Sequence, residues 1–231
     1  MKIKAAVFDL DHTLFDRYAT LRIVAGDFRK FFEISEGVTD EFIARELIWA
    51  DKQYVHFGWE KIHAHLVGKG IFANPPSFEE YRDFLLGRFH CYAVPFPFTR
   101  PMLLELREKG IKTGLITNGS HELQYKKLAM VGIDDCFDSI IATRDIGVHK
   151  PERGPFDIMS ARLGLKNSEC LYIGDNPLND VEASRRAGYI PVWIRTTGVW
   201  CYPEYEKPEL QADTVEEIPA IIEKLNSTGG R

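Results

Sequence analysis

Two aspartates stand two positions apart directly after the first apolar run of the chain. Ala5-Ala6-Val7-Phe8 is followed by Asp9 and Asp11, and a later apolar run is followed by Asp175 and Asp180. Carboxylates that end buried strands repel one another unless a cation binds between them. Carboxylate oxygens suit a hard divalent ion. The spacing therefore indicates a Mg²⁺ site.

A hydroxyl and an ammonium group complete the set of candidate residues. Thr117 ends another apolar run, and Lys150 lies in the loop after a further one. Such donors, together with a metal ion, stabilise the charge that spreads over phosphoryl oxygens in a transition state. These residue types favour a site that handles a small phosphorylated substrate.

The elements that must position these residues read as a parallel sheet. The expected strands are residues 4–9, 112–117, 139–143, 170–174 and 190–195. Their apolar residues are continuous rather than alternating, which is typical of strands covered on both faces. The expected helices between them are residues 120–131, 155–163, 179–187 and 216–225. The pattern predicts an α/β fold with a doubly wound parallel sheet, whose ligands bind beyond the carboxyl ends of the strands.

A long helical stretch interrupts this alternation after the first strand. Thr39 is a good helix start, and Ser77 with Glu80 has the spacing of a capping box. We therefore predict an all-helical inserted domain of roughly four helices over residues 15–98. Residues 1–14 and 99–226 would form the catalytic core, and the small polar residues 227–231 a flexible tail.

The order of the motifs resembles that of the haloacid dehalogenase (HAD) superfamily, in its phosphatase branch with a type-one helical cap. The motifs are Asp9-Leu10-Asp11-His12-Thr13, Thr117-Asn118-Gly119, Lys150, and Gly174-Asp175 through Asp180, and they span nearly the whole chain. The resemblance implies a Rossmann-like core with the helical insertion as its cap.

The resemblance also implies residue roles. Asp9 would be the nucleophile and a Mg²⁺ ligand. Asp11 would be the general acid and base, and a ligand through its backbone carbonyl. Asp175 would be a direct metal ligand, and Thr117 and Lys150 would bind phosphate.

The remaining motif residues would support these groups. Asn118 would contact the phosphoryl group through its backbone, and Asp180 would orient Lys150 or a metal-bound water. The other supporting residues are Thr13, Gly174 and Asn176.

The function predicted from these roles is Mg²⁺-dependent hydrolysis of a phosphomonoester through an aspartyl-phosphate intermediate. A phosphonate hydrolase or a phosphomutase on the same core is an alternative, and Lys52 in the insertion would be the Schiff-base former of a phosphonate hydrolase. A non-enzymatic phosphoacceptor or binding module is an alternative of a different class. Asp11 favours the enzyme, because an acid/base beside the phosphoaspartate promotes turnover.

The composition of the chain limits the classes of molecule that the protein is expected to bind. The net charge of −5 provides no general field for nucleic acid or an anionic membrane. The four cysteines, Cys91, Cys136, Cys170 and Cys201, form no CxxC pair and are expected to be reduced and mostly buried. The first apolar run is too short for a signal peptide, so a cytoplasmic protein is expected. The oligomeric state stays open.

Histidines and aromatic residues of the insertion have simpler interpretations. His63 and His65 stand two apart, so on a helix they do not face each other, and no second metal is expected. Most aromatic side chains of the insertion are expected to pack in its core. They are Trp49, Tyr54, Phe57, Trp59, Tyr81 and Phe84.

Overall fold

Two compact units make up the chain in the computed structural model, which describes residues 2–196, 200 and 202–228. One unit comprises Met1–Phe15 with Pro95–Arg231, and the other comprises Asp16–Val94. The sequence placed these boundaries after residues 14 and 98. The difference arises because the two connecting segments pair as short strands, β2 (Phe15–Asp16) and β3 (Val94–Pro95).

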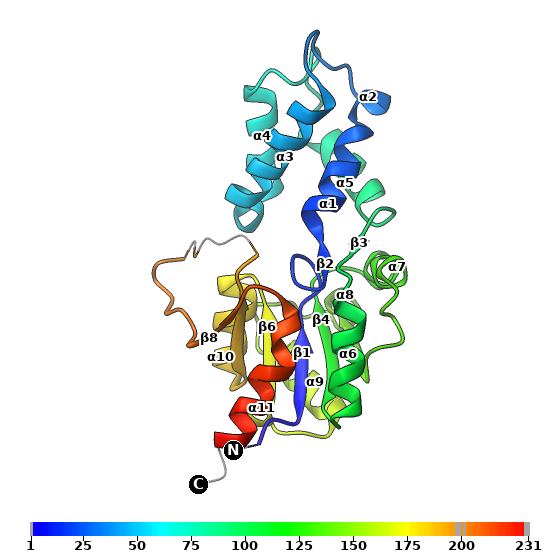
Figure 1. Ribbon diagram of the computed structural model, residues 1–231. Helices are drawn as coiled ribbons and strands as arrows, with labels where there is room; N and C mark the ends of the chain where they lie inside the picture. Colours follow the sequence, from blue (N-terminus) through cyan, green and yellow to red (C-terminus); the bar gives the residue numbers. More distant parts are fainter. Residues whose placement is uncertain (1, 197–199, 201, 229–231) are drawn as a thin grey trace. The chain divides into compact units, whose positions relative to one another are not determined.

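A six-stranded sheet forms the centre of the larger unit (Figure 1). Its order is β5-β4-β1-β6-β7-β8, and every neighbouring pair is parallel. The strands are β1 (Ala5–Phe8), β4 (Lys112–Thr117), β5 (Ser139–Ala142), β6 (Cys170–Gly174), β7 (Ile190–Ile194) and β8 (Leu210–Ala212). The predicted α/β fold class is confirmed. Strand β8 was not predicted, because three residues carry too little periodicity to be recognised.

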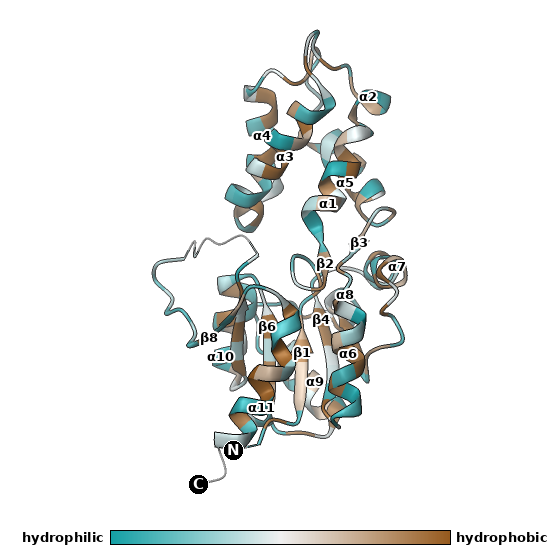
Figure 2. Ribbon diagram, in the orientation of Figure 1, coloured by the Kyte–Doolittle hydropathy of each residue, from teal (hydrophilic) through white to brown (hydrophobic). Residues whose placement is uncertain are grey.

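Continuous burial explains the continuous apolar runs. Every residue of β1 and β6 is buried, and these strands are among the most apolar segments in Figure 2. The side chains of Val7, Ile116 and Tyr172 meet Phe156 and Met159 of a covering helix in one core cluster. The loops that follow β1 and β6 thus leave fully buried strands.

Helices cover both faces of this sheet (Figure 1). They are α6 (Thr99–Glu108), α7 (His121–Val131), α8 (Thr143–Ile146), α9 (Gly154–Leu163), α10 (Ala183–Ala187) and α11 (Ile218–Thr228), with the short turns η2 (Asn167–Glu169) and η4 (Val215–Glu217). Gly164 and Gly188 end α9 and α10 in the left-handed conformation, as predicted, with φ of 67° and 92°.

Two expectations for these helices were wrong. The single helix expected over residues 179–187 is a π-helical turn, η3 (Pro177–Glu182), followed by α10. Ser227 and Thr228, assigned to a tail, continue α11, while residues 229–231 lie outside the described residues. The hydroxyl of Thr228 donates to the carbonyl of Lys224, which extends the last turn.

The smaller unit is helical, with five helices and one 3₁₀ turn rather than four helices. They are α1 (Arg17–Gly26), α2 (Phe28–Phe31), α3 (Asp40–Tyr54), η1 (Val55–Phe57), α4 (Trp59–Gly68) and α5 (Phe78–Phe89). Thr39 caps α3, and Ser77 with Glu80 forms the predicted capping box of α5. A buried ion pair joins α1 to α3, because Arg17 Nη2 lies 2.8 Å from Asp51 Oδ1.

Aromatic side chains of this unit divide between core and surface. Tyr81 and Phe84 are buried against Phe28, with ring centroids 6.4 and 5.3 Å from its centroid. Trp49 and Phe57 are 45% and 43% exposed, so the expectation of core packing was wrong for these two.

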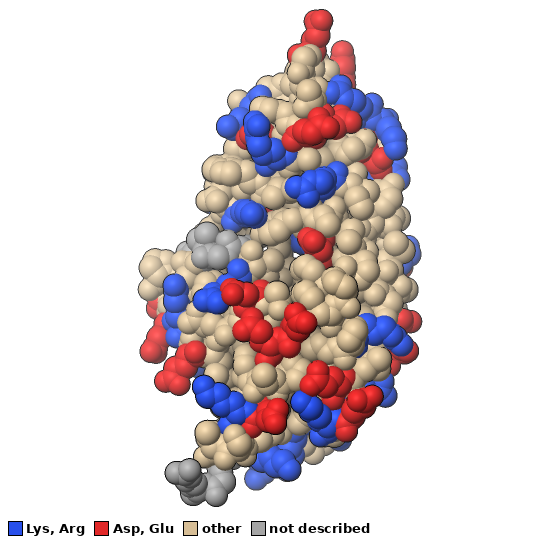
Figure 3. All heavy atoms as spheres, viewed as in Figure 1, with Lys and Arg blue, Asp and Glu red and all other residues tan. Residues whose placement is uncertain are grey.

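The surface carries charges of both signs. On the face shown in Figure 3, basic side chains are scattered in small groups, and several acidic side chains lie together near the middle of the view. Within the described residues, every helix is too short or too polar to cross a membrane.

Candidate active site

The carboxyl edge of the sheet brings the sequence motifs together. Strand β1 lies between β4 and β6, so Asp9 after β1 lies between Thr117, which ends β4, and Gly174, which ends β6. The backbone N–H of Asp9 donates to the carbonyl of Ile173 at 2.8 Å, which continues the hydrogen-bond ladder of the sheet to this aspartate. Parallel strands of equal register thus place three motifs side by side.

Lys150 is the centre of a buried polar cluster. Its ammonium donates to Asp9 Oδ1 at 2.7 Å and to Asp180 Oδ1 at 2.7 Å. A third bond, 2.9 Å long, joins it to the hydroxyl of Tyr172, which in turn donates to the carbonyl of Ile116. Sequence reasoning linked Lys150 with Asp180, but it missed Tyr172. The signal for Tyr172 is a hydroxyl in an otherwise apolar strand.

The turn after β6 holds the Asp180 carboxylate from its other side. The backbone N–H of Asn176 donates to Asp180 Oδ2 at 3.0 Å, and the Asn176 side chain caps η3 by accepting from the N–H groups of Leu178 and Asn179. A Cβ on Gly174 would lie 2.5 Å from the Asp180 carboxyl group. Only glycine therefore leaves room for this carboxylate at the end of the strand.

The side chain of Asn118 clamps the loop that carries Lys150. Its Oδ1 accepts from the Lys150 N–H at 3.0 Å, and its Nδ2 donates to the Lys150 carbonyl at 2.9 Å. The hydroxyl of Thr143 donates to the same Oδ1 at 3.1 Å. Asn118 was expected to act through its backbone, whereas these three hydrogen bonds give its side chain the separate task of positioning the lysine.

Burial dominates the electrostatics of this cluster. Desolvation raises the pKa of Asp9 to about 7; Lys150 opposes this shift, and the nearby carboxylates of Asp180 and Asp11 add to it. Burial by itself would lower the pKa of Lys150, but Asp180 and Asp9 outweigh it and hold that pKa well above its usual value. Lys150 is therefore an ammonium ion at neutral pH, while Asp9 requires further positive charge to be fully ionised.

Three carboxylates form the best cation site in the described part of the chain. Oxygens of Asp9, Asp175 and Asp180 lie within 4.8 Å of one another, and all three residues are buried. The backbone carbonyl of Asp175 is held by the indole N–H of Trp193 at 2.9 Å. Buried carboxylate oxygens are the donor set that Mg²⁺ prefers, so these residues fit the expected ion. The expected contact of Asp11 with the ion runs through its backbone carbonyl, and its carboxylate is not part of this group.

The Asp11 carboxylate instead faces a lysine that sequence reasoning missed. Lys127 Nζ lies 2.8 Å from both Asp11 Oδ1 and Asp11 Oδ2. Lys127 is buried on α7 together with Gln124, Leu128 and Val131. The sequence did contain a signal for this lysine: Gln124 and Lys127 are polar residues at positions where an amphipathic helix usually carries apolar ones.

The other predicted residues of the first two motifs are also buried. Thr117 is the last residue of β4, and the backbone N–H of Thr13 donates to the Leu10 carbonyl at 3.3 Å. His12 adopts the left-handed conformation with φ of 63°. Its carbonyl accepts from the hydroxyl of Thr196, which fixes the turn between Asp11 and Thr13.

Residues singled out in the insertion have local partners. His63 Nε2 is 2.9 Å from the Pro76 carbonyl, and His65 Nε2 is 3.0 Å from Glu46 Oε2. The ammonium of Lys52 lies over the ring of Tyr18, 4.8 Å from its centroid. Each of these side chains thus takes part in the packing of the helical unit.

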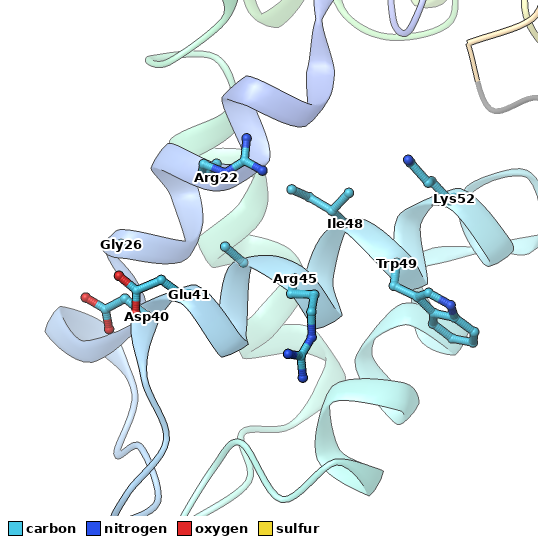
Figure 4. A pocket seen from close by; sticks show the side chains of 9 residues that line it. Arg22, Gly26, Asp40, Glu41, Arg45, Ile48, Trp49 and Lys52 are labelled. Carbon is cyan, nitrogen blue, oxygen red and sulfur yellow. The ribbon is translucent and has the colours of Figure 1, made fainter.

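A groove of about 640 Å³ lies within the helical unit. Figure 4 shows Arg22, Ile48 and Lys52 pointing into the space between α1 and α3, while Trp49 points away from it. The rim carries both signs of charge, since Asp40 also lines it.

Comparison with known proteins identifies the family. The profile of the haloacid dehalogenase-like hydrolases matches residues 3–188. The chain belongs to this family. The resemblance seen in its motifs is thereby confirmed.

Individual HAD relatives agree with this assignment. The chain is similar to a glyceraldehyde 3-phosphate phosphatase of Methanopyrus kandleri, with 29% identity over 96% of this chain and 98% of the relative. It shares its fold with the HAD hydrolase YfnB of Bacillus subtilis, solved with magnesium bound (TM-score 0.69, 21% identity, 96% and 99% of the two chains). An L-2-haloacid dehalogenase of Xanthobacter autotrophicus has the same fold (TM-score 0.67, 19% identity, 96% and 98% covered). The comparisons agree with a phosphatase of this family, the enzyme class that the sequence predicts.

Proposed function

We propose that this protein is a Mg²⁺-dependent phosphatase that hydrolyses a small phosphomonoester through an aspartyl phosphate on Asp9. The observation that carries the proposal is the buried group of Asp9, Asp175 and Asp180, two of which, Asp9 and Asp180, contact the Lys150 ammonium. It combines a nucleophilic carboxylate, a hard-cation site and a fixed positive charge at the end of a parallel sheet. The phosphatase relative of nearly equal length supports the same chemistry.

In this proposal Asp9 attacks phosphorus and the bond to the leaving oxygen breaks. Asp11 donates its proton to the departing alkoxide and so becomes a carboxylate. It then removes a proton from the water that attacks the aspartyl phosphate, which releases inorganic phosphate and restores Asp9. Lys150 and Thr117 supply positive charge and a hydroxyl donor for the phosphoryl oxygens.

Mg²⁺ would be held by the carboxylates of Asp9 and Asp175 and by the backbone carbonyl of Asp11. When bound, the ion supplies charge that favours ionised Asp9 and attracts an anionic substrate. The magnesium-bound relative of the same fold supports this choice of ion. Asp180, held by Lys150 and the Asn176 N–H, would orient Lys150.

We also propose that Asp16–Val94 acts as the cap domain, and that the reaction takes place in the cytoplasm. The three described cysteines, Cys91, Cys136 and Cys170, are free thiols, which suits a reducing compartment. Cys136 and Cys170 are buried as expected, whereas Cys91 is exposed.

The decisive experiment measures release of inorganic phosphate from p-nitrophenyl phosphate and from a panel of phosphorylated metabolites that includes glyceraldehyde 3-phosphate. We expect Mg²⁺-dependent hydrolysis that EDTA abolishes and that Asp9→Asn lacks. An Asp9→Asn protein with wild-type turnover would eliminate the nucleophile. Halide release from 2-chloropropionate without phosphate release would replace the phosphatase with a dehalogenase.

The phosphoacceptor alternative has a distinct outcome in the same assay. A signalling module would form a long-lived phosphoprotein with acetyl phosphate and would not turn over. Multiple turnovers per protein molecule exclude it. Borohydride trapping with a phosphonoaldehyde tests the phosphonate hydrolase, with Lys52→Met as the matched variant.

A further inference from the structure

We propose that Lys127 is a positioning residue that holds the Asp11 carboxylate in place for proton transfer. The inference rests on the proposed function, because it concerns the residue assigned as general acid and base.

Lys127 and Asp11 are in direct contact. The Lys127 ammonium contacts both oxygens of Asp11 at 2.8 Å. The Lys127 side chain is only 6% exposed, whereas that of Asp11 is 28% exposed. An ammonium withdrawn from water forms a stronger and better oriented pair than a surface lysine does. The pair therefore sets the direction of the Asp11 carboxylate, while the exposed part of Asp11 remains accessible.

The helix that carries Lys127 is also anchored to the loop after β4. Gln124, one turn before Lys127, donates from Nε2 to the Asn118 carbonyl at 2.7 Å. A Cβ on Gly119, whose φ is 146°, would lie 2.3 Å from that amide, so glycine permits the approach. One face of α7 therefore contacts two loops: Gln124 binds the loop after β4, and Lys127 binds Asp11 in the loop after β1.

Lys127 also brings positive charge next to a group of carboxylates. The carboxylates of Asp9, Asp175 and Asp180 lie together, and Lys150 pairs with Asp9 and Asp180. The charge of Asp11 acts on Asp9, and Lys127 brings a cation into direct contact with Asp11. Removing Lys127 would therefore leave the Asp11 carboxylate poorly oriented for proton transfer.

The test is a double-mutant cycle between Lys127→Met and Asp11→Asn, with Lys126→Met as the matched control. Lys126 lies on the same helix, is 56% exposed and pairs with Glu122. We expect Lys127→Met to lower kcat about 10- to 100-fold on an alkyl phosphate, and less on p-nitrophenyl phosphate, whose leaving group needs little protonation. KM and the Mg²⁺ concentration for half-maximal activity should change far less.

Two further results are expected. In the Asp11→Asn background, Lys127→Met should alter kcat by less than about 2-fold, because its effect runs through Asp11. Lys127→Arg should restore part of the lost kcat, whereas Lys126→Met should match the wild type. Thermal melting of every variant monitors folding, and Lys127→Gln takes the place of Lys127→Met if the latter does not fold.

Several outcomes would overturn the inference. Multiplicative losses in the double variant would show that Lys127 acts independently of Asp11. Equal losses on both substrates that follow the loss of melting temperature would assign Lys127 a purely structural role. Absence of phosphate release by the wild-type protein on any substrate would reject the proposed function and this inference together, whereas the other outcomes reject the inference alone.

Discussion

At the scale of single residues, the proposed chemistry uses two aspartates that have different surroundings. Asp9 is buried against Lys150, whereas Asp11 is partly exposed and faces Lys127. A carboxylate fixed by one ammonium in the interior suits nucleophilic attack, and one that reaches solvent suits proton exchange with alcohol and water. Their separate partners thus support separate roles for residues only two positions apart.

Replacing Asp11 by Asn should slow both half-reactions, because the amide neither donates nor accepts the required proton. General acid and base catalysis contributes about 10²- to 10⁴-fold, so kcat on an alkyl phosphate should fall by at least that range. The loss on p-nitrophenyl phosphate should be smaller. Steady-state and burst kinetics on both substrates measure this difference; equal losses, with phosphorylation rate-limiting for both, would remove Asp11 from the acid role.

The raised pKa of Asp9 predicts how Mg²⁺ stabilises the protein at different pH values. Its pKa of about 7 lies above the ordinary value of 3.8, so between these values the native state binds more protons on Asp9 than the unfolded chain does. The contribution of Asp9 to the stability of the metal-free protein is therefore full at low pH and is lost as pH rises through this window.

A bound cation removes that loss by favouring the ionised form. Mg²⁺ should raise the melting temperature more at pH 7.5 than at pH 5, as differential scanning fluorimetry can measure. Asp9→Asn serves as the control, because other groups titrate in the same range and only the difference between the two proteins reports Asp9. An equal Mg²⁺ effect at both pH values in the wild type would contradict the prediction.

At the scale of elements, strand ends and tight turns set the geometry of the cluster. Asp180 is held by a lysine on one side and by the N-terminal turn of η3 on the other. Gly174 ends β6 directly beneath it. The geometry of the candidate site therefore depends on the absence of a Cβ at Gly174 as well as on the charged side chains.

Gly174→Ala should lower kcat strongly, because its Cβ would lie 2.5 Å from the Asp180 carboxyl and displace the partner of Lys150. Overpacking of this kind typically costs about 1 to 3 kcal/mol of stability. Gly87→Ala is the matched control, since Gly87 stands inside helix α5 and a Cβ there would meet no atom within 4 Å. Phosphatase assays and urea unfolding compare the two; equal behaviour would mean that the space above Gly174 is not critical.

At the scale of the whole molecule, each unit has a buried core of its own, and the candidate catalytic residues belong to only one unit. The candidate catalytic residues all lie in Met1–Phe15 with Pro95–Arg231. Asp16–Val94 has its own buried core and its own buried ion pair between Arg17 and Asp51, with the Arg17 guanidinium 4.4 Å from the Phe89 ring centroid. A substitution that destabilises one unit should therefore have little effect on the other unit.

Asp51→Asn should destabilise the helical unit by about 3 to 5 kcal/mol, because it replaces the carboxylate that pairs with the buried Arg17 guanidinium by a neutral amide. The Mg²⁺ affinity of the catalytic unit should stay unchanged. Asp83→Asn is the control, since Asp83 pairs with Arg82 on the surface, where such a pair contributes about 0 to 1 kcal/mol. Chemical unfolding and calorimetric Mg²⁺ titration test both statements; a weakened Mg²⁺ affinity in Asp51→Asn would show that the two units are energetically linked.

The sequence by itself determined the α/β core, the family and the order of the motifs. Continuous apolar runs indicate buried parallel strands, and the ends of such strands share one edge of the sheet, so Asp9, Thr117 and Gly174 could be assigned to that edge without coordinates. Local signals such as the capping box at Ser77 and the C-terminal Gly164 were equally readable, because they depend on residues only a few positions apart.

Only the tertiary structure decided which side chains touch across the motifs. Lys127 meets Asp11 over a separation of 116 residues, and the Tyr172 hydroxyl meets Lys150 over 22 residues. Neither residue follows a strand end, so the rule that located the other site residues does not reach them. Their contacts arise from the way helix α7 and the loop of Lys150 pack on the sheet. The sequence pattern marks Lys127 and Tyr172 only as polar groups among apolar residues, and it does not show which distant side chain each one meets.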